Sequence, residues 1–89
     1  MKHVVKRHGH SEKYDARKLY ASVYAACRSV REPAGSAELI AEKVVTDMDE
    51  WIATKHEVTS NDVRISAVRH LKAYHPDAAY MYLHHRVVW

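Results

Sequence analysis

The chain has 89 residues, of which 47% are hydrophobic, and its formal net charge is +3. A chain of this length has room for only one core, so we predict a single domain over residues 1–89. No segment approaches the roughly 20 apolar residues of a membrane span, and the N-terminus lacks a signal peptide's apolar stretch. We therefore expect a cytoplasmic protein without a membrane partner.

The number of cysteines and the distribution of charge exclude some kinds of site and favour one class of ligand. Cys27 is the single cysteine, which excludes an intramolecular disulfide and any zinc site built from several cysteines. Because it falls in an apolar helical stripe, we expect it in the core. The first 20 residues carry six Lys and Arg against Glu12 and Asp15, a net +4, whereas the remainder has eight against nine. Such a local basic patch suits a small polyanion such as a nucleotide.

The N-terminal segment has the pattern of a short β-hairpin followed by a helix. Residues 3–6 and 12–14 flank Gly9, which can adopt the positive φ of a tight turn. Asp15 is a typical N-cap, so the first helix should begin directly after it. The helical pattern stops before residues 32–35 (EPAG), which we interpret as a breaker cluster.

Two further helices follow in the middle of the chain. Ser36 is the predicted N-cap of the second helix, whose apolar stripe ends near Thr54. Thr59, followed three residues later by Asp62, has the spacing of a capping box with an acidic third residue. This spacing predicts a third helix that runs to about Tyr74.

The last helix completes the predicted fold. Pro76 should end the third helix, since proline disfavours helical geometry in the residue before it, and Asp77 can cap a fourth. The predicted order is a hairpin and then four helices. The fold class is mainly α with a small β-hairpin (α+β).

No catalytic motif is present, and we predict that the chain is not an enzyme. It has no serine or cysteine in a nucleophile motif, no P-loop and no dinucleotide fingerprint. With two glycines in the chain, phosphate would have to be held by side chains, for which Lys6, Arg7 and Lys18 are the candidates. Lys18 can lean over the start of the first helix, or can be an ordinary solvated lysine.

Two other sets of polar residues have competing interpretations. Glu12 lies across the predicted hairpin from the basic pair, where it can form a cross-strand salt bridge or accept a hydrogen bond from adenine or ribose. The chain has eight histidines, but adjacent His84 and His85 diverge by about 100° on a helix and cannot easily share an ion. We therefore predict no metal site.

A second function class remains open. The basic N-terminus, together with three cations of the third helix, could follow the phosphate backbone of a nucleic acid. These cations are Arg64, Arg69 and Lys72. A small nucleic-acid-binding module is therefore the alternative to a nucleotide-binding domain.

Several segments in the right order resemble the ATP-cone family over nearly the whole chain. They are residues 4–9 (VVKRHG), 12–15 (EKYD), 18–19 (KL), 58–63 (VTSNDV) and 76–80 (PDAAY) with Arg86. The resemblance implies a hairpin cap packed on a four-helix bundle that binds ATP or dATP together with Mg²⁺. It also implies an allosteric sensor of the kind that accompanies ribonucleotide reductase large subunits and the repressor of their genes.

The resemblance also implies a set of nucleotide-binding residues. Lys6 and Arg7 would contact phosphates, and Glu12 and Lys18 would line the base and phosphate region. Asp15 would lie beside the ribose or base. The remaining positions are Val5, Ser60 and Arg64, which would approach the nucleotide, and Tyr14, Leu19 and Val63, which would form an apolar floor under the adenine or belong to the core.

The chain departs from the family pattern at two points. His8 stands where the family usually has Asp, which makes the turn less acidic. The 89 residues contain neither the catalytic barrel of a reductase nor the cysteine-based zinc ribbon of the repressor. We therefore expect a regulatory output that passes through a homo-oligomer or a partner chain.

Overall fold

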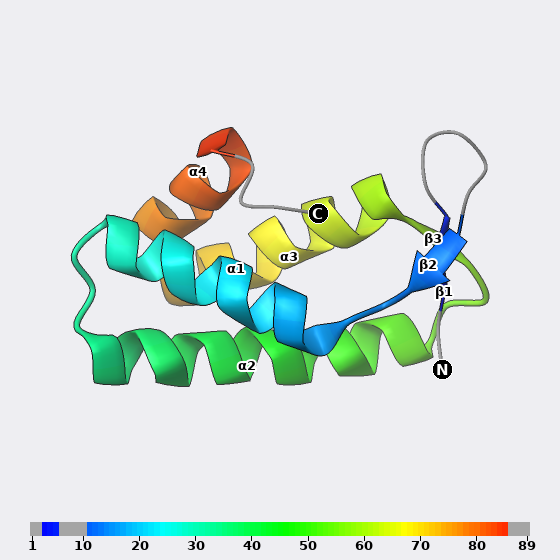
Figure 1. Ribbon diagram of the computed structural model, residues 1–89, viewed down its shortest axis with the longest axis horizontal. Coiled ribbons are helices and arrows are strands. Elements are labelled where there is room, and N and C mark those ends of the chain that lie inside the picture. The colour runs from blue at the N-terminus through cyan, green and yellow to red at the C-terminus, as the bar shows by residue number, and fades with distance from the viewer. Residues whose placement is uncertain (1–2, 6–10, 86–89) are drawn as a thin grey trace.

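A computed structural model describes residues 3–5 and 11–85 of the chain (Figure 1). The predicted mainly helical class is confirmed, because four helices make up most of this part. The elements are β1 (His3–Val5), β2 (Ser11–Lys13), α1 (Ala16–Ser29), α2 (Ala34–Ala53), β3 (Val58–Thr59), α3 (Ser60–Tyr74) and α4 (Pro76–His85).

The helices pack in a closed ring around one core. α1 contacts α2 and α4, and α3 contacts the same two helices from the other side. In Figure 1, α1 and α2 lie alongside each other, with α3 behind them and the strands at one end. The largest fully buried side chains come from all four helices and include Leu19, Met48, Leu71 and Tyr82. None of the helices in the described ranges is long and apolar enough to cross a membrane.

The strands form a three-stranded sheet in the order β2-β1-β3. β1 pairs antiparallel with β2, with Val4 opposite Glu12, while the turn predicted around Gly9 lies outside the described residues. The predicted second strand, residues 12–14, is displaced by one position, because β2 is Ser11–Lys13. β3 was not predicted. It pairs in parallel with β1, and two residues are too few to produce a recognisable alternation of side chains.

The ends of α1 combine one predicted feature with one that was missed. Asp15 is the N-cap as predicted, and its Oδ1 accepts a hydrogen bond from the Arg17 amide at 2.9 Å. At the other end, the amides of Glu32 and Arg31 bond back to the carbonyls of Cys27 and Arg28, the pattern of a Schellman motif. Arg31 has the positive φ of this motif, 66°, in a position that usually carries glycine.

Two predicted helix starts were wrong, and in both the helix begins earlier than predicted, next to a proline. α2 begins at Ala34, after Pro33 as N-cap, so Ser36 lies inside its first turn and the predicted breaker cluster is partly helical. α4 begins at Pro76, which needs no hydrogen-bonding amide at the first helical position, so Asp77 is not the cap. The cap therefore lies three residues before the predicted position at α2 and two residues before it at α4.

His75 takes the capping role that was predicted for Asp77. Its Nδ1 lies 3.2 Å from the Ala78 amide, which donates to it, and its Nε2 lies 2.9 Å from a carboxylate oxygen of Glu32. Because Nδ1 accepts a hydrogen bond, the ring proton of the neutral imidazole is on Nε2 and is donated to Glu32. One side chain thus fixes the start of α4 to the α1–α2 connection.

The capping box of α3 is confirmed and gives a first prediction. The Thr59 hydroxyl accepts from the Asp62 amide at 3.0 Å, and the Asp62 carboxylate accepts from the Thr59 amide at 3.1 Å. We expect Thr59→Ala to lower the free energy of unfolding by about 1 kcal/mol, measured by urea denaturation. Thr46→Ala is the matched control within α2, and its effect should be near zero or stabilising. Equal losses in both variants would contradict the role of the cap.

Candidate functional site

The sheet brings Val5, the last residue of β1, beside the start of α3. β1 and β3 run in parallel with Val5 beside Thr59, the N-cap of α3, and β1 also contacts this helix. Val5 directly precedes Lys6 and Arg7 in the chain, and both of these residues lie outside the described part. Val5 is therefore the described residue that directly precedes the predicted phosphate contacts in the chain.

The start of α1 supplies two of the predicted residues. Lys18 is the third residue of this helix and is exposed, so its ammonium group is available to a ligand. Asp15 is half-buried, and its carboxylate already holds the Arg17 amide and lies 3.7 Å from the Arg17 Nε. The cap thus occupies one of the two Asp15 oxygens.

The start of α3 supplies Ser60 and Arg64 on one flank of the helix. They are four residues apart and therefore separated by only about 40° around the helix axis. Both side chains are half-buried, and the Arg64 Nη2 donates to the Asn61 Oδ1 at 2.8 Å. This hydrogen bond holds the guanidinium group near the N-terminal turn of α3.

The three predicted floor residues are part of the core or pack against it. Leu19 and Val63 have no exposed surface, and Tyr14 packs against the core cluster while half-buried. The Tyr14 hydroxyl oxygen is buried and has no hydrogen-bond partner among the described residues. Burial, followed by the negative charge of Asp49 on α2, raises the pKa of this hydroxyl above its ordinary value. Contact of these three side chains with adenine remains a prediction.

Glu12 lies in β2, and it was predicted either to form a cross-strand salt bridge or to accept a hydrogen bond from adenine or ribose. The register pairs Glu12 with Val4 rather than with Lys6 or Arg7. Lys6 and Arg7 lie outside the described residues, so a salt bridge between Glu12 and either of them stays a prediction. The contact of Glu12 with base or ribose also stays a prediction.

Both helix starts at this end of the bundle are capped by the chain's own side chains. Asp15 accepts from an α1 amide, while Thr59 and Asp62 satisfy each other's amides at α3. The carboxylates also offset the positive ends of the two helix dipoles, which would otherwise favour an anion. A phosphate at this end would therefore depend on lysine and arginine side chains, as the sequence predicted.

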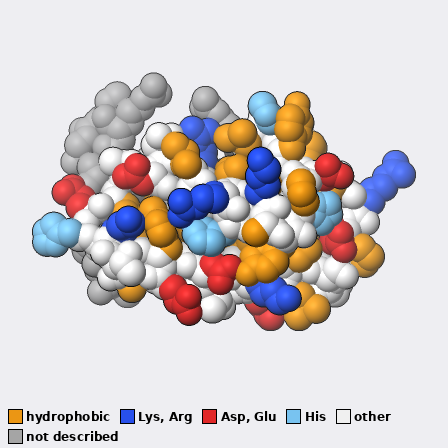
Figure 2. Space-filling model, turned by 180° about the vertical axis from the view of Figure 1, so that it is seen from behind, with side chains coloured by type: hydrophobic (Ala, Val, Ile, Leu, Met, Phe, Trp, Pro, Cys, Tyr) orange, Lys and Arg blue, Asp and Glu red, His pale blue; other side chains and the backbone are white. Residues whose placement is uncertain are grey.

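The cations proposed for a nucleic-acid interface do not share one face of α3. Arg69 lies about 140° around the helix from Arg64, and Arg64 is held by Asn61. The rear face of the molecule, seen in Figure 2, has Lys and Arg interspersed with acidic and hydrophobic side chains. This distribution differs from the continuous basic stripe that would follow a phosphate backbone.

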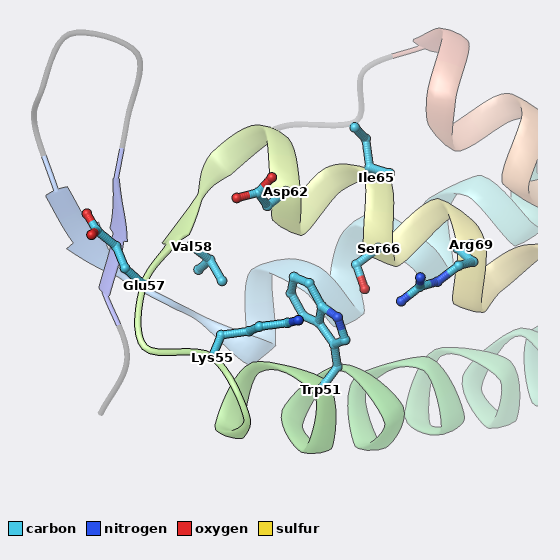
Figure 3. A pocket seen from close by; sticks show the side chains of 8 residues that line it. All are labelled: Trp51, Lys55, Glu57, Val58, Asp62, Ile65, Ser66 and Arg69. Atoms are coloured by element: carbon cyan, nitrogen blue, oxygen red, sulfur yellow. The ribbon is translucent and has the colours of Figure 1, made fainter.

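A hollow on the other flank of α3 was missed by sequence reasoning. We name it the α2–α3 pocket, and it lies between the end of α2 and the outer side of α3 (Figure 3). The available signal was the four-residue spacing of an apolar and a basic residue, Trp51 with Lys55 at the end of α2 and Ile65 with Arg69 in α3. The pocket is lined by Trp51, Lys55, Glu57, Val58, Asp62, Ile65, Ser66 and Arg69.

Cys27 is in the core, as predicted, and provides a pH-dependent prediction. Burial, and then the charge of Glu32, raises the pKa of its thiol to about 11 from an ordinary value of 9.0. The folded state therefore keeps this proton at a higher pH than the unfolded state does, so stability falls as the pH rises from about 9 toward 11. In urea denaturation at pH 8 and pH 10.5, Cys27→Ala should lose less stability on alkalinisation than the unaltered protein. Identical losses would argue against a protected thiol.

Metal-ligating side chains do not cluster within the described ranges. No group of three or more His, Cys, Asp or Glu there has the arrangement to hold an ion. Within the described residues, His75 contacts the carboxylate of Glu32, and this contact joins the α1–α2 connection to the α3–α4 connection.

Four helices with a small three-stranded sheet at one end define a small α+β domain built on a helical bundle. The sequence matches the ATP cone domain family over residues 2–88, and the chain belongs to this family. ATP-cone domains are regulatory rather than catalytic, and they bind ATP or dATP as effectors. The comparison with curated proteins gives no match.

Proposed function

We propose that residues 1–89 act as a single regulatory domain that binds ATP or dATP at the sheet end of the bundle. The observation that carries this proposal is the parallel pairing of β1 with β3, which brings Val5 beside the N-cap of α3. The next two residues in the chain are Lys6 and Arg7. The family membership supports an adenine nucleotide as the ligand.

In this proposal the phosphates are held by side chains from three segments. Lys6 and Arg7 contribute a mobile point charge and a planar fork of donors, and Lys18 adds a third cation from the exposed side of α1. Arg64 approaches from the start of α3. Mg²⁺ would accompany the nucleotide and reduce the repulsion between its phosphates.

The base and ribose would contact the other predicted residues. Glu12 and Asp15 would accept hydrogen bonds, and the second Asp15 oxygen is the one that the cap leaves available. Ser60 would add a hydroxyl group. Leu19 and Val63, which are fully buried in the core, would support the adenine from beneath, with Tyr14 beside it.

Regulation would follow if the nucleotide fixes the N-terminal hairpin as a cap on α1 and α3. A ligand shifts a conformational equilibrium only by its differential affinity for the two states, typically about 1–3 kcal/mol. Such a shift is enough to change self-association or binding to a partner chain. The target would be ribonucleotide reductase or expression of its genes, in the cytoplasm.

The direct test is calorimetric titration of the protein with ATP and with dATP, each with Mg²⁺, while light scattering follows the molecular mass. We expect saturable binding of at least one nucleotide together with a change in mass. Absence of binding by a folded sample would refute the nucleotide site. Binding without a change in mass would leave a partner chain as the route of regulation.

A further inference from the structure

The α2–α3 pocket has the size of a small ligand site, and its lining combines an apolar wall with charged side chains. Its volume is about 360 Å³, near the lower end of the roughly 300–1,000 Å³ that ligand pockets usually occupy. The apolar wall consists of half-buried Trp51, buried Val58 and Ile65, whose side chain is 55% exposed. An isoleucine this exposed beside an indole ring leaves apolar surface that a ligand could cover.

Two cations stand at this apolar wall. The Lys55 Nζ lies 5.4 Å from the centroid of the Trp51 ring, a cation–π distance. Figure 3 shows the Arg69 side chain extending toward Trp51 from α3. Arg69 has no hydrogen bond or ion pair with any residue of the described ranges. A guanidinium group without a carboxylate partner is suited to bind an anion with two parallel hydrogen bonds.

The acidic lining residues are directed elsewhere. The Asp62 carboxylate accepts the Thr59 amide in the capping box, so it is engaged at the start of α3. The exposed Glu57 side chain extends toward the strands and away from Trp51 in Figure 3. The part of the pocket between Trp51 and Arg69 therefore carries a positive charge. The two carboxylates at the edge of the pocket would repel a long polyanion such as a nucleic acid.

We propose that the α2–α3 pocket is a second ligand site, which binds a small aromatic carboxylate. The ligand's ring would lie against Trp51 and Ile65, and its carboxylate would bind the Arg69 guanidinium group. This site does not depend on the proposed nucleotide site, because Arg69 lies about 180° around α3 from Ser60.

The test uses phenylacetate and its neutral, equally sized analogue phenylacetamide as probes of the whole ¹⁵N-labelled chain. The indole N–H signal of Trp51, identified by its loss in Trp51→Phe, reports occupancy of the pocket by nuclear magnetic resonance. We expect phenylacetate to shift this signal and to bind at least about fivefold more tightly than phenylacetamide. Arg69→Gln should abolish the preference for the anion, while saturating ATP should leave it unchanged.

Arg31→Gln is the matched control, since it removes the same charge from the exposed α1–α2 connection and should keep the full preference. Four results would overturn the proposal. They are an unperturbed Trp51 signal, equal affinities for the two probes, equal losses in the two arginine variants, and displacement of phenylacetate by ATP. The spectrum of each variant also verifies that it is folded.

Discussion

Replacing Lys6 or Arg7 with alanine is expected to weaken ATP and dATP binding about 10- to 150-fold. Each change removes a charge-assisted contact to phosphate, which is worth on the order of 1.5–3 kcal/mol. The loss should be large because the amides at the starts of α1 and α3 are already capped by Asp15 and by Thr59 with Asp62. Backbone groups at these helix starts cannot readily replace a lost side-chain cation.

Calorimetric titration of each variant with both nucleotides measures this effect. Lys72→Ala is a suitable control, because Lys72 is exposed in the last turn of α3, far from the start of that helix. It removes one positive charge and should change affinity by less than a factor of about 2. If both N-terminal variants keep normal affinity, the phosphate assignment is wrong, whereas a uniform loss in all three would indicate general electrostatic attraction. Circular dichroism should record the same helical content throughout.

The caps that were predicted correctly depend on chemistry within three residues. Asp15 bonds to an amide two residues on, and Thr59 and Asp62 bond to each other. The cap that was missed depends on contacts distant in sequence, because His75 is oriented by Glu32, which belongs to another connection. Local patterns therefore predicted the number and order of helices, while the position of a helix start required the tertiary structure.

The same distinction applies to the sheet and to the candidate site. β3 is two residues long, and it is a strand only because Val58 meets Val4 from the distant N-terminus. The family motif named Leu19 among the site residues, but sequence alone could not establish that its side chain has no exposed surface. The α2–α3 pocket likewise arises from residues of two helices and of the connection and strand between them, which no single motif contains.

The largest stability effect is expected at Leu19. Its side chain is fully buried at the end of α1 nearest the sheet, so Leu19→Ala removes apolar contacts and leaves a cavity. We expect the free energy of unfolding to fall by about 2–5 kcal/mol, a large part of the 5–15 kcal/mol typical of small domains. Urea denaturation gives this value. Leu39→Ala makes the same chemical change on α2 at a side chain that is 59% exposed, and it should cost less than about 0.5 kcal/mol.

Nucleotide affinity then separates the two interpretations of Leu19. Val23 is also fully buried, one turn further along α1 and further from the sheet. If Leu19 supports the adenine, Leu19→Ala should weaken ATP binding under conditions where it remains folded, whereas Val23→Ala should reduce stability alone. If the two variants bind ATP equally well, Leu19 is a core residue without a part in the site. A strong loss of affinity in both would mean that ligand binding depends on the rigidity of α1 as a whole, because Val23 lies one turn further from the sheet end than Leu19.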